Sequence, residues 1–180
     1  MTTLKVLVTS SALLLFATLS AGAQQPATPA TPAAPATPAA APAVPLVYGA
    51  PITLEVAKRA VAAAEAEARK NNWNVMIVIL DSGGHTVMSQ RLDGTQYASI
   101  RIAHGKARTA LEFKRPTKAL DDTIAAGGGG LRLLSVGGVT AIEGGIPIVV
   151  DGKIVGSIGV SGVTAQQDAQ IARAGAEAVK

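Results

Sequence analysis

The stretch that decides the fold is residues 143–168, which read EGGIPIVVDGKIVGSIGVSGVTAQQD. An apolar run at 146–150 is followed by Asp151-Gly152 and a second strand-like segment at 153–163. An Asp-Gly pair between two such runs predicts a β-hairpin with a type I′ turn, because both central residues of that turn need a positive φ.

The end of this stretch predicts how the hairpin is closed and covered. Thr164 and Gln167 have the spacing of a capping box, which predicts that a helix begins there. The second strand carries Gly156, Gly159 and Gly162, although glycine weakens the interior of a strand. We therefore expect a packed helix, a partner subunit or a ligand to approach this backbone closely.

The segments before the hairpin alternate between helical and strand-like patterns. Thr53 is a favourable N-cap for a helix that ends near Lys70, and alanines recur along that helix at helical spacing. The other expected elements are a buried strand at 75–80, its antiparallel partner at 85–91, a helix at 98–113, a helical turn at 120–124, a flexible loop at 127–130 and a short strand at 139–142.

The order of helix, hairpin, helix, loop, hairpin and helix predicts the fold class. Each hairpin supplies antiparallel strands, and each amphipathic helix needs a sheet face to cover. We expect an α/β fold, an α+β sandwich in which a central antiparallel sheet is flanked by helices on both faces.

The N-terminal residues have the pattern of a secretory signal peptide at 1–23. Lys5 provides the positive region, an interrupted apolar stretch follows, and Ala21-Gly-Ala23 offers small residues at a cleavage site after Ala23. The apolar stretch is too short for a membrane span. We expect a periplasmic or secreted protein whose mature chain has no membrane span.

A low-complexity segment at 24–47 follows the signal. It is uncharged, rich in Ala, Pro and Thr, and holds seven of the ten prolines. Such a composition favours an extended, disordered tether over a packed domain. One domain is then expected at 48–180.

Composition excludes several classes of site. The formal net charge is +4 and aromatic residues make up 3% of the chain, so neither strong phosphate contacts nor base stacking is indicated and we expect no nucleic-acid partner. The absence of cysteine excludes disulfides, thiolate catalysis and cysteine-ligated metal.

A set of short motifs in a fixed order resembles the GlcG/HbpS family of haem-binding proteins, which includes the C-terminal domain of PduO-type proteins. The matching pieces are Leu54-x-x-Ala57, Val78-x-x-Asp81-x-Gly-Gly84, Arg91-x-Asp93-Gly94, Ile102-Ala-x-x-Lys106-Ala-x-Thr-Ala110, Gly144-Gly-x-Pro147, Gly156-x-Ile-Gly-Val-Ser-Gly162 and Gln167-Asp168. The resemblance implies a compact profilin/PAS-like domain, a homo-oligomer such as a ring or octamer, and haem or a related tetrapyrrole as the ligand.

The helix at 98–113 carries the first candidate site. At helical spacing His104 lies at the edge of an alanine-rich face, with Arg101 three residues before it and Arg108 four residues after it. An imidazole for the iron, an apolar wall for the macrocycle and cations for the propionates would suit haem. The alternative is a solvated basic face with a histidine at its boundary.

His85 is the second candidate iron ligand, because it follows a Gly-Gly turn where a ligand could reach it. The alternative is a turn histidine in water. His85 and His104 are the two histidines of the chain, and the remaining candidate axial donors are Met76, Met88, Tyr48 and Tyr97.

The other charged residues of the matched motifs favour a structural role over a catalytic one. Arg91, Asp93 and Lys106 are interpreted as a buried ion-paired cluster, and Lys106 lies on a second face of its helix that we expect a neighbouring subunit to cover. Glu143 is either a ligand-facing carboxylate or the end of a strand.

No catalytic constellation is evident from the spacing of these residues. The main hypothesis is an exported, non-catalytic haem-binding protein in haem or iron handling, storage or sensing. The alternatives are a cofactor-free oligomeric scaffold or enzyme partner, and a small-molecule enzyme using Glu143, Asp93 and Lys106.

Overall fold

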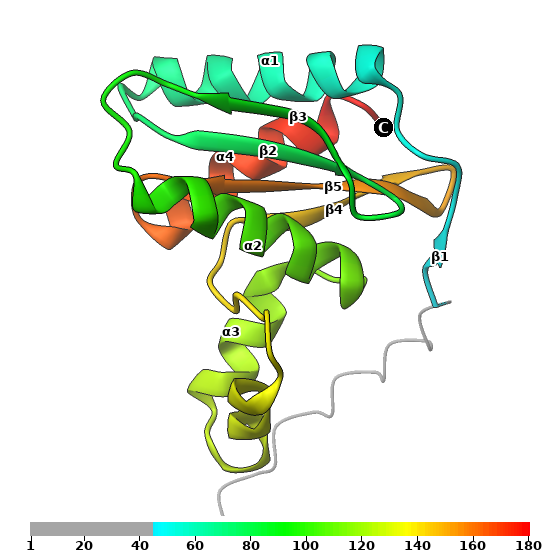
Figure 1. The fold of residues 1–180 in the computed structure, drawn as a ribbon, viewed down its shortest axis with the longest axis vertical. Coiled ribbons are helices and arrows are strands. Elements are labelled where there is room, and N and C mark those ends of the chain that lie inside the picture. The colour runs from blue at the N-terminus through cyan, green and yellow to red at the C-terminus, as the bar shows by residue number, and fades with distance from the viewer. Residues whose placement is uncertain (1–44) are drawn as a thin grey trace, which may run out of the picture. The chain divides into compact units, whose positions relative to one another are not determined.

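The computed structural model describes residues 45–180, so the expected signal at 1–23 and nearly all of the tether lie outside the described residues. The expected succession of helix, hairpin, helix, hairpin and helix is confirmed (Figure 1). The elements are β1 (Val47–Tyr48), α1 (Leu54–Lys70), β2 (Met76–Asp81), β3 (Thr86–Arg91), α2 (Ala98–Glu112), α3 (Thr117–Ala125), the 3₁₀ helix η1 (Gly128–Ser135), β4 (Gly145–Val150), β5 (Lys153–Ser161) and α4 (Ala165–Glu177).

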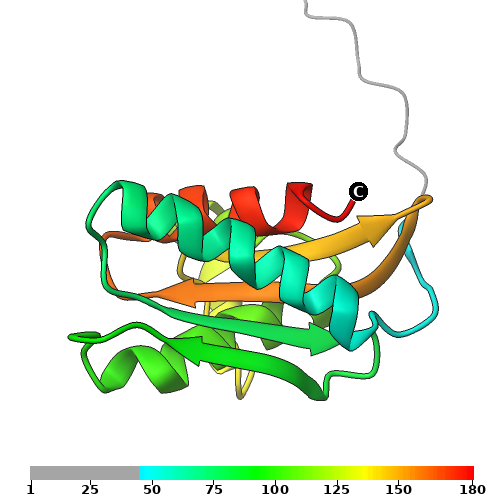
Figure 2. The ribbon, with the colours of Figure 1, turned by 90° about the horizontal axis from the view of Figure 1, so that it is seen from above.

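The sheet has the order β4–β5–β2–β3, and all of these neighbours are antiparallel. The short β1 adds a parallel pair beside the first residues of β5, so that Val47, expected in the tether, lies opposite Lys153. Helices α1 and α4 cover one face of the sheet and α2 covers the other (Figure 2). The predicted sandwich is therefore confirmed.

The local signals around the second hairpin are formed as predicted. Asp151 and Gly152 have φ of 48° and 72°, as a type I′ turn requires. The Thr164 side chain accepts a hydrogen bond from the Gln167 backbone N–H, and the Gln167 side-chain oxygen accepts one from the Thr164 N–H. The capping box thereby fixes where α4 begins.

The glycines of β5 allow very close backbone contacts within the chain. A Cβ at Gly159 would lie 2.1 Å from the Ala103 carbonyl oxygen of α2. At Gly156 and Gly162 the same atom would meet the carbonyl oxygens of Leu80 and Asn74, at 2.2 and 2.3 Å. Of the three expected neighbours of this backbone, a packed helix is confirmed at Gly159.

The alanine stripe of α1 is buried as its spacing predicted. Its small side chains let α1 lie close to α4 and to the sheet, and the core between these layers is entirely aliphatic apart from Trp73. The stripe comprises Ala57, Ala60, Val61, Ala64 and Ala68.

The expected strand at 139–142 is wrong, because that segment is an irregular loop. Its Thr140 backbone N–H donates to the Thr109 side chain, which ties the segment to α2 instead of to a strand. The expected loop at 127–130 is replaced in large part by η1, and the helical turn at 120–124 is the nine-residue helix α3. Figure 1 shows α3 and η1 extending away from the sheet as a lobe beyond α2.

Candidate functional site

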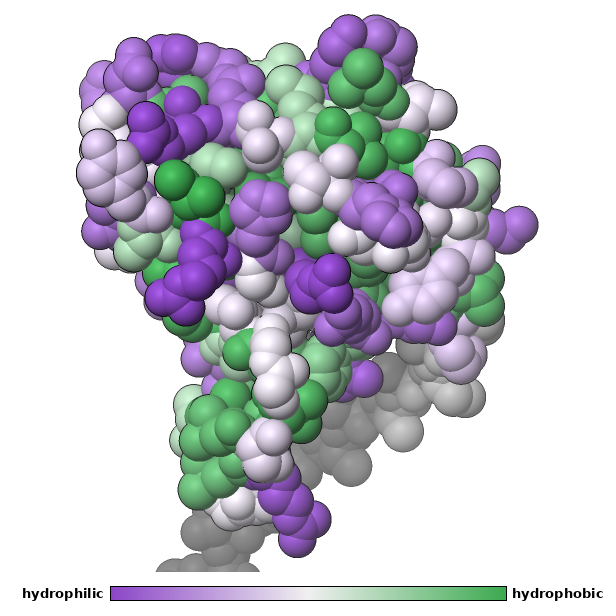
Figure 3. Space-filling view, in the orientation of Figure 1, coloured by the Kyte–Doolittle hydropathy of each residue, from purple (hydrophilic) through white to green (hydrophobic). Residues whose placement is uncertain are grey.

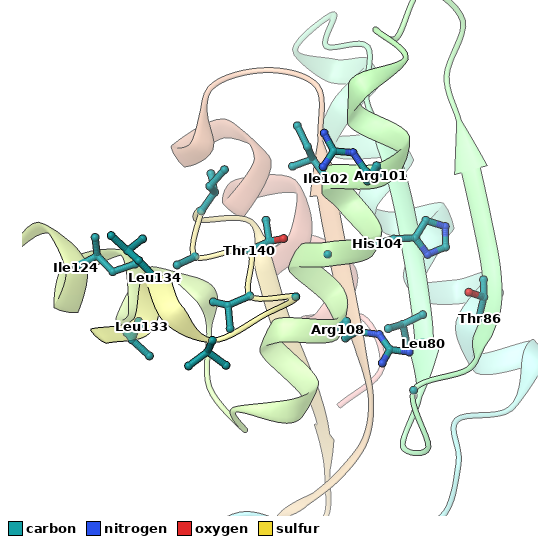
Figure 4. Close-up of a pocket in the computed structure, with 17 residues that line it drawn as sticks. Leu80, Thr86, Arg101, Ile102, His104, Arg108, Ile124, Leu133, Leu134 and Thr140 are labelled. Carbon is teal, nitrogen blue, oxygen red and sulfur yellow. The ribbon is translucent and has the colours of Figure 1, made fainter. Parts of the chain in front are cut away.

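A cavity of about 980 Å³ lies over the outer surface of α2. One wall comes from the β2–β3 hairpin, and the opposite wall comes from the lobe, which we define as α3, η1 and the connecting loop 136–142 (Figure 4). The lining residues are Leu80, Gly84, Thr86, Arg101, Ile102, His104, Gly105, Arg108, Ile124, Leu133, Leu134, Val136, Gly138, Val139, Thr140, Ala141 and Ile142.

Helix α2 brings three of the predicted residues into this cavity. Arg101 and Arg108 lie three residues before and four after His104, so all three share the face of α2 that points away from the sheet. His104 is half-buried and the two arginines are exposed. Figure 4 shows His104 and Arg108 on the side of α2 toward the hairpin, near Thr86 and Leu80.

The lining is cationic and apolar and contains no carboxylate. Arg108 forms an ion pair with Glu112, in which Nη1 lies 3.1 Å from Oε1, but Glu112 itself does not line the cavity. The lobe supplies the apolar wall, and Figure 3 shows a hydrophobic area on it. An anionic ligand with a large apolar surface suits such a lining better than a cation or a sugar does.

His85 lies outside this lining, although its neighbour Gly84 is part of it. The His85 side chain is 83% exposed, and its Nδ1 lies 3.4 Å from Oδ1 of Asp81. The same Asp81 oxygen accepts hydrogen bonds from the backbone N–H groups of Gly83 and His85, which form the turn. The structure thus brings Arg101, His104 and Arg108 together and leaves His85 in an exposed turn.

The other candidate donors also lie outside the cavity lining. Tyr48 donates its hydroxyl hydrogen to the Leu111 carbonyl, and Tyr97 is 80% exposed beside Arg91. Met76 is buried in β2, and Met88 packs against the core. Among the described residues, no three His, Asp or Glu side chains gather closely enough to hold a metal ion.

The predicted cluster of Arg91, Asp93 and Lys106 is wrong. Arg91 and Asp93 are exposed, while Lys106 is buried and its ammonium lies 2.7 Å from Asp168. Lys106 reaches Asp168 and the Val160 carbonyl because its face of α2, which was expected to meet a neighbouring subunit, is covered by this chain's own β4, β5 and loop residues.

Glu143 is buried at the start of the segment leading to β4, with Arg173 at 3.8 Å. It does not line the cavity. The carboxylate therefore belongs to the packing of α4 against this segment, and the structure does not combine it with Asp93 and Lys106 into one site.

The lobe wall is what sequence reasoning missed. Many of its apolar side chains come from residues 131–136, between two glycine runs, to which the sequence pattern assigned no element. The apolar residues 131, 133, 134 and 136 were the available signal, since a solvated loop rarely holds so many. Gly105 and Thr140, which meet on the surface of α2, carry no sequence signal of their own.

The donor set fits haem. The His104 imidazole can ligate iron, the arginines can pair with carboxylates, and the lobe offers an apolar surface for a macrocycle. Residues 52–177 match the family model for "Haem degrading protein HbpS-like". The chain belongs to the HbpS-like family.

Known relatives of this HbpS-like chain agree with its fold. Protein GlcG of Escherichia coli K12 is 40% identical over 110 residues, which cover 61% of this chain and 81% of GlcG. The crystal structure of a double mutant of Streptomyces reticuli HbpS matches with a TM-score of 0.68 at 34% identity, covering 81% of this chain and 98% of that one. The crystal structure of a PduOC–haem complex matches with a TM-score of 0.66 at 27% identity, covering 72% and 96% of the two chains.

Within residues 45–180, no helix is both long enough and apolar enough to span a membrane.

Proposed function

We propose that this chain is an exported haem-binding protein, without a catalytic step of its own, that acts in haem or iron handling, storage or sensing. The observation that carries the proposal is the cavity on α2, where His104 lies between two arginines in a lining free of carboxylates. A volume of about 980 Å³ is at the upper end of the range of about 300–1,000 Å³ for small-molecule sites. The family match and the haem complex of the PduOC relative support the same ligand.

Haem supplies an iron that takes axial ligands and changes its spectrum with them. In this cavity His104 would ligate that iron through a neutral imidazole nitrogen. Arg101 and Arg108 would pair with the propionates, and the lobe would exclude water from the macrocycle with Leu133, Leu134 and other apolar side chains.

The test is a titration of the purified ligand-free protein with hemin, followed by its Soret absorption. We expect a saturable change at a fixed ratio of hemin to subunit. His104→Ala should change the Soret position and weaken binding, whereas His85→Ala, an exposed histidine outside the cavity, is the matched control and should leave both unchanged. A broad response without saturation in the unmodified protein would refute the proposal.

The export part of the proposal rests on the signal pattern at 1–23. It has its own test in fractionation of expressing cells and N-terminal sequencing of the isolated protein. Export with cleavage after Ala23 gives a chain that begins at Gln24. A protein that stays in the cytoplasm with Met1 intact would overturn this part alone.

Self-association is a second proposal, favoured by apolar side chains on the lobe surface. Leu131 and Leu134 are 49% and 70% exposed, and Val136 and Ile142 are 46% and 44% exposed. Single exposed apolar residues are common, but a group on one projection is typical of an interaction site. We expect light scattering to give a homo-oligomer that Leu134→Asp dissociates, and a monomer at all micromolar concentrations would contradict it.

A further inference from the structure

We propose that Thr109 and Gly105 are positioning residues for the cavity, which clamp loop 136–142 against α2 through Thr140. Only one part of this proposal, the effect of the clamp on ligand release, rests on the haem-binding function proposed above. The clamp itself is a property of the ligand-free protein and has a test of its own.

The first contact of the clamp is a partly buried hydrogen bond. The backbone N–H of Thr140 donates to Oγ1 of Thr109 at 2.8 Å, and Thr109 is 1% exposed. Within residues 45–180 this is the one hydrogen bond that joins loop 136–142 to α2. A backbone donor that lost this acceptor would stay unpaired or draw in water, so the loop would detach more readily.

The second contact is a close approach at Gly105, in the interior of α2. Glycine there destabilises a helix relative to alanine. A Cβ at Gly105 would lie 2.2 Å from Oγ1 and 3.1 Å from Cβ of Thr140. No side chain fits between them, so glycine is required at 105 for Thr140 to lie on the helix.

The rest of the loop has little else to hold it. A Cβ at Gly137 or Gly138 would meet no atom within 4 Å, and Val136 is exposed. Anchoring begins again at the buried Glu143 and at Gly144, whose carbonyl accepts from the Val160 N–H at 2.9 Å. Thr140 is therefore the middle point at which this wall of the cavity is fixed.

The position of the clamp makes it a determinant of the cavity's width. Gly105 follows His104 directly, so the same turn of α2 that presents the imidazole also holds the opposite wall. Figure 4 shows Thr140 and His104 on opposite sides of α2. A ligand in contact with both sides is released when the wall moves away, and we infer that the clamp slows this release.

Three variants test the hydrogen bond. Thr109→Val removes the acceptor with little change in shape, and Thr109→Ser keeps it. Thr95→Val is the matched control, because it removes a similarly buried threonine hydroxyl, bonded to the Leu92 carbonyl, outside both the lobe and the cavity lining. Two measurements are made on each: amide hydrogen exchange at Thr140 without ligand, and transfer of bound hemin to excess apomyoglobin.

We expect Thr109→Val to speed exchange at Thr140 and hemin release by about three- to tenfold each, as the loss of one net hydrogen bond predicts. Thr109→Ser should behave as the unmodified protein, and Thr95→Val should release hemin at the unmodified rate. Unchanged exchange at Thr140 in Thr109→Val overturns the clamp. Faster exchange with unchanged hemin release overturns its role for the ligand.

A double variant tests the close approach independently. Gly105→Ala should speed hemin release, because the new methyl group displaces Thr140. Adding Thr140→Ala removes the hydroxyl that it meets first, so the double variant should release hemin more slowly than Gly105→Ala alone. Purely additive effects would overturn this contact. If the unmodified protein binds no hemin, the haem proposal fails, and exchange at Thr140 still decides the clamp.

Discussion

The ammonium of Lys106 lies 2.7 Å from Oδ2 of Asp168, and the two side chains are 1% and 3% exposed. Lys106 also donates to the Val160 carbonyl at 3.0 Å, and the other Asp168 oxygen accepts from the Val163 N–H at 3.2 Å. Burial raises the pKa of Asp168, although the nearby ammonium opposes this rise. The pair joins α2, the end of β5 and the beginning of α4.

Lys106→Met is expected to destabilise the fold strongly. Removing one partner leaves the other charge buried and uncompensated, which typically costs about 3–5 kcal/mol. The free energy of unfolding from urea titration at pH 7 measures this. Lys58→Met, which breaks an exposed pair with Glu55, is the control and should change stability by less than about 1 kcal/mol.

The second variant to compare is Lys106→Met combined with Asp168→Asn, which removes both charges. We expect it to be more stable than Lys106→Met alone, because no unpaired charge is left in the interior. Equal stability of the single and double variants would contradict this account of the pair.

The hairpin of β4 and β5 and the beginning of α4 could be predicted because their signals are local. Asp151-Gly152 determines the turn by its backbone preference, and Thr164 and Gln167 satisfy each other's backbone groups within one helical turn. Such signals act over a few residues and depend little on the rest of the fold.

The partner of Lys106 could not be predicted in this way. Asp168 is 62 positions away along the chain, and the two residues meet only because α2 and the beginning of α4 both pack beside the end of β5. The shared occurrence of Arg91, Asp93 and Lys106 in the matched motifs favoured Arg91 and Asp93, which the structure leaves exposed. Pairs of residues far apart in the sequence depend on how the elements pack, and the sequence pattern of a single segment does not predict that packing.

The same difference between local signals and long-range contacts applies to the candidate site. His104, Arg101 and Arg108 share a face of one helix, so helical spacing alone places them together. The lobe wall reaches them through the contact between Thr140 and α2, and no periodic pattern encodes that contact. The sequence therefore predicted the α2 residues of the cavity but not its lobe wall.

Gly159→Ala is expected to push α2 away from β5. The added methyl carbon would lie 2.1 Å from the Ala103 carbonyl oxygen and 2.6 Å from the Ala107 nitrogen, both of which are backbone atoms. We expect a loss of about 1–3 kcal/mol or more, seen as a lower Tm. Gly137→Ala, where the methyl group meets nothing within 4 Å, is the control, and an equal loss there would contradict the prediction.

Glu112→Gln is expected to strengthen hemin binding. Glu112 pairs with Arg108 at 3.1 Å, and both side chains are more than half exposed, so the pair is weak. Without it Arg108 is free for a propionate, and we expect affinity to rise by about two- to fivefold in a hemin titration. Arg108→Gln should lower it. Glu55→Gln, on α1, is the control, and a similar gain there would show that only the net charge matters.

Asp81 makes the turn between β2 and β3 sensitive to acid. Partial burial acts to raise its pKa, but hydrogen bonds from the His85 and Gly83 backbone, with the nearby His85 ring, hold the pKa below its ordinary value. A carboxyl with a lowered folded-state pKa adds stability above its unfolded-state pKa of about 4. That stability is lost as the pH falls through the lower, folded-state pKa.

Asp81→Asn should therefore be less stable than the unmodified protein at pH 6, and its stability should fall less steeply as the pH drops below about 4. Urea unfolding at a series of pH values measures both differences. Asp93→Asn, at an exposed aspartate after β3, is the control and should keep the unmodified slope. Equal slopes for Asp81→Asn and the unmodified protein would show that the charge on Asp81 does not hold this turn. A carboxylate is the stronger acceptor, so protonation should weaken the hydrogen bonds from the two N–H groups.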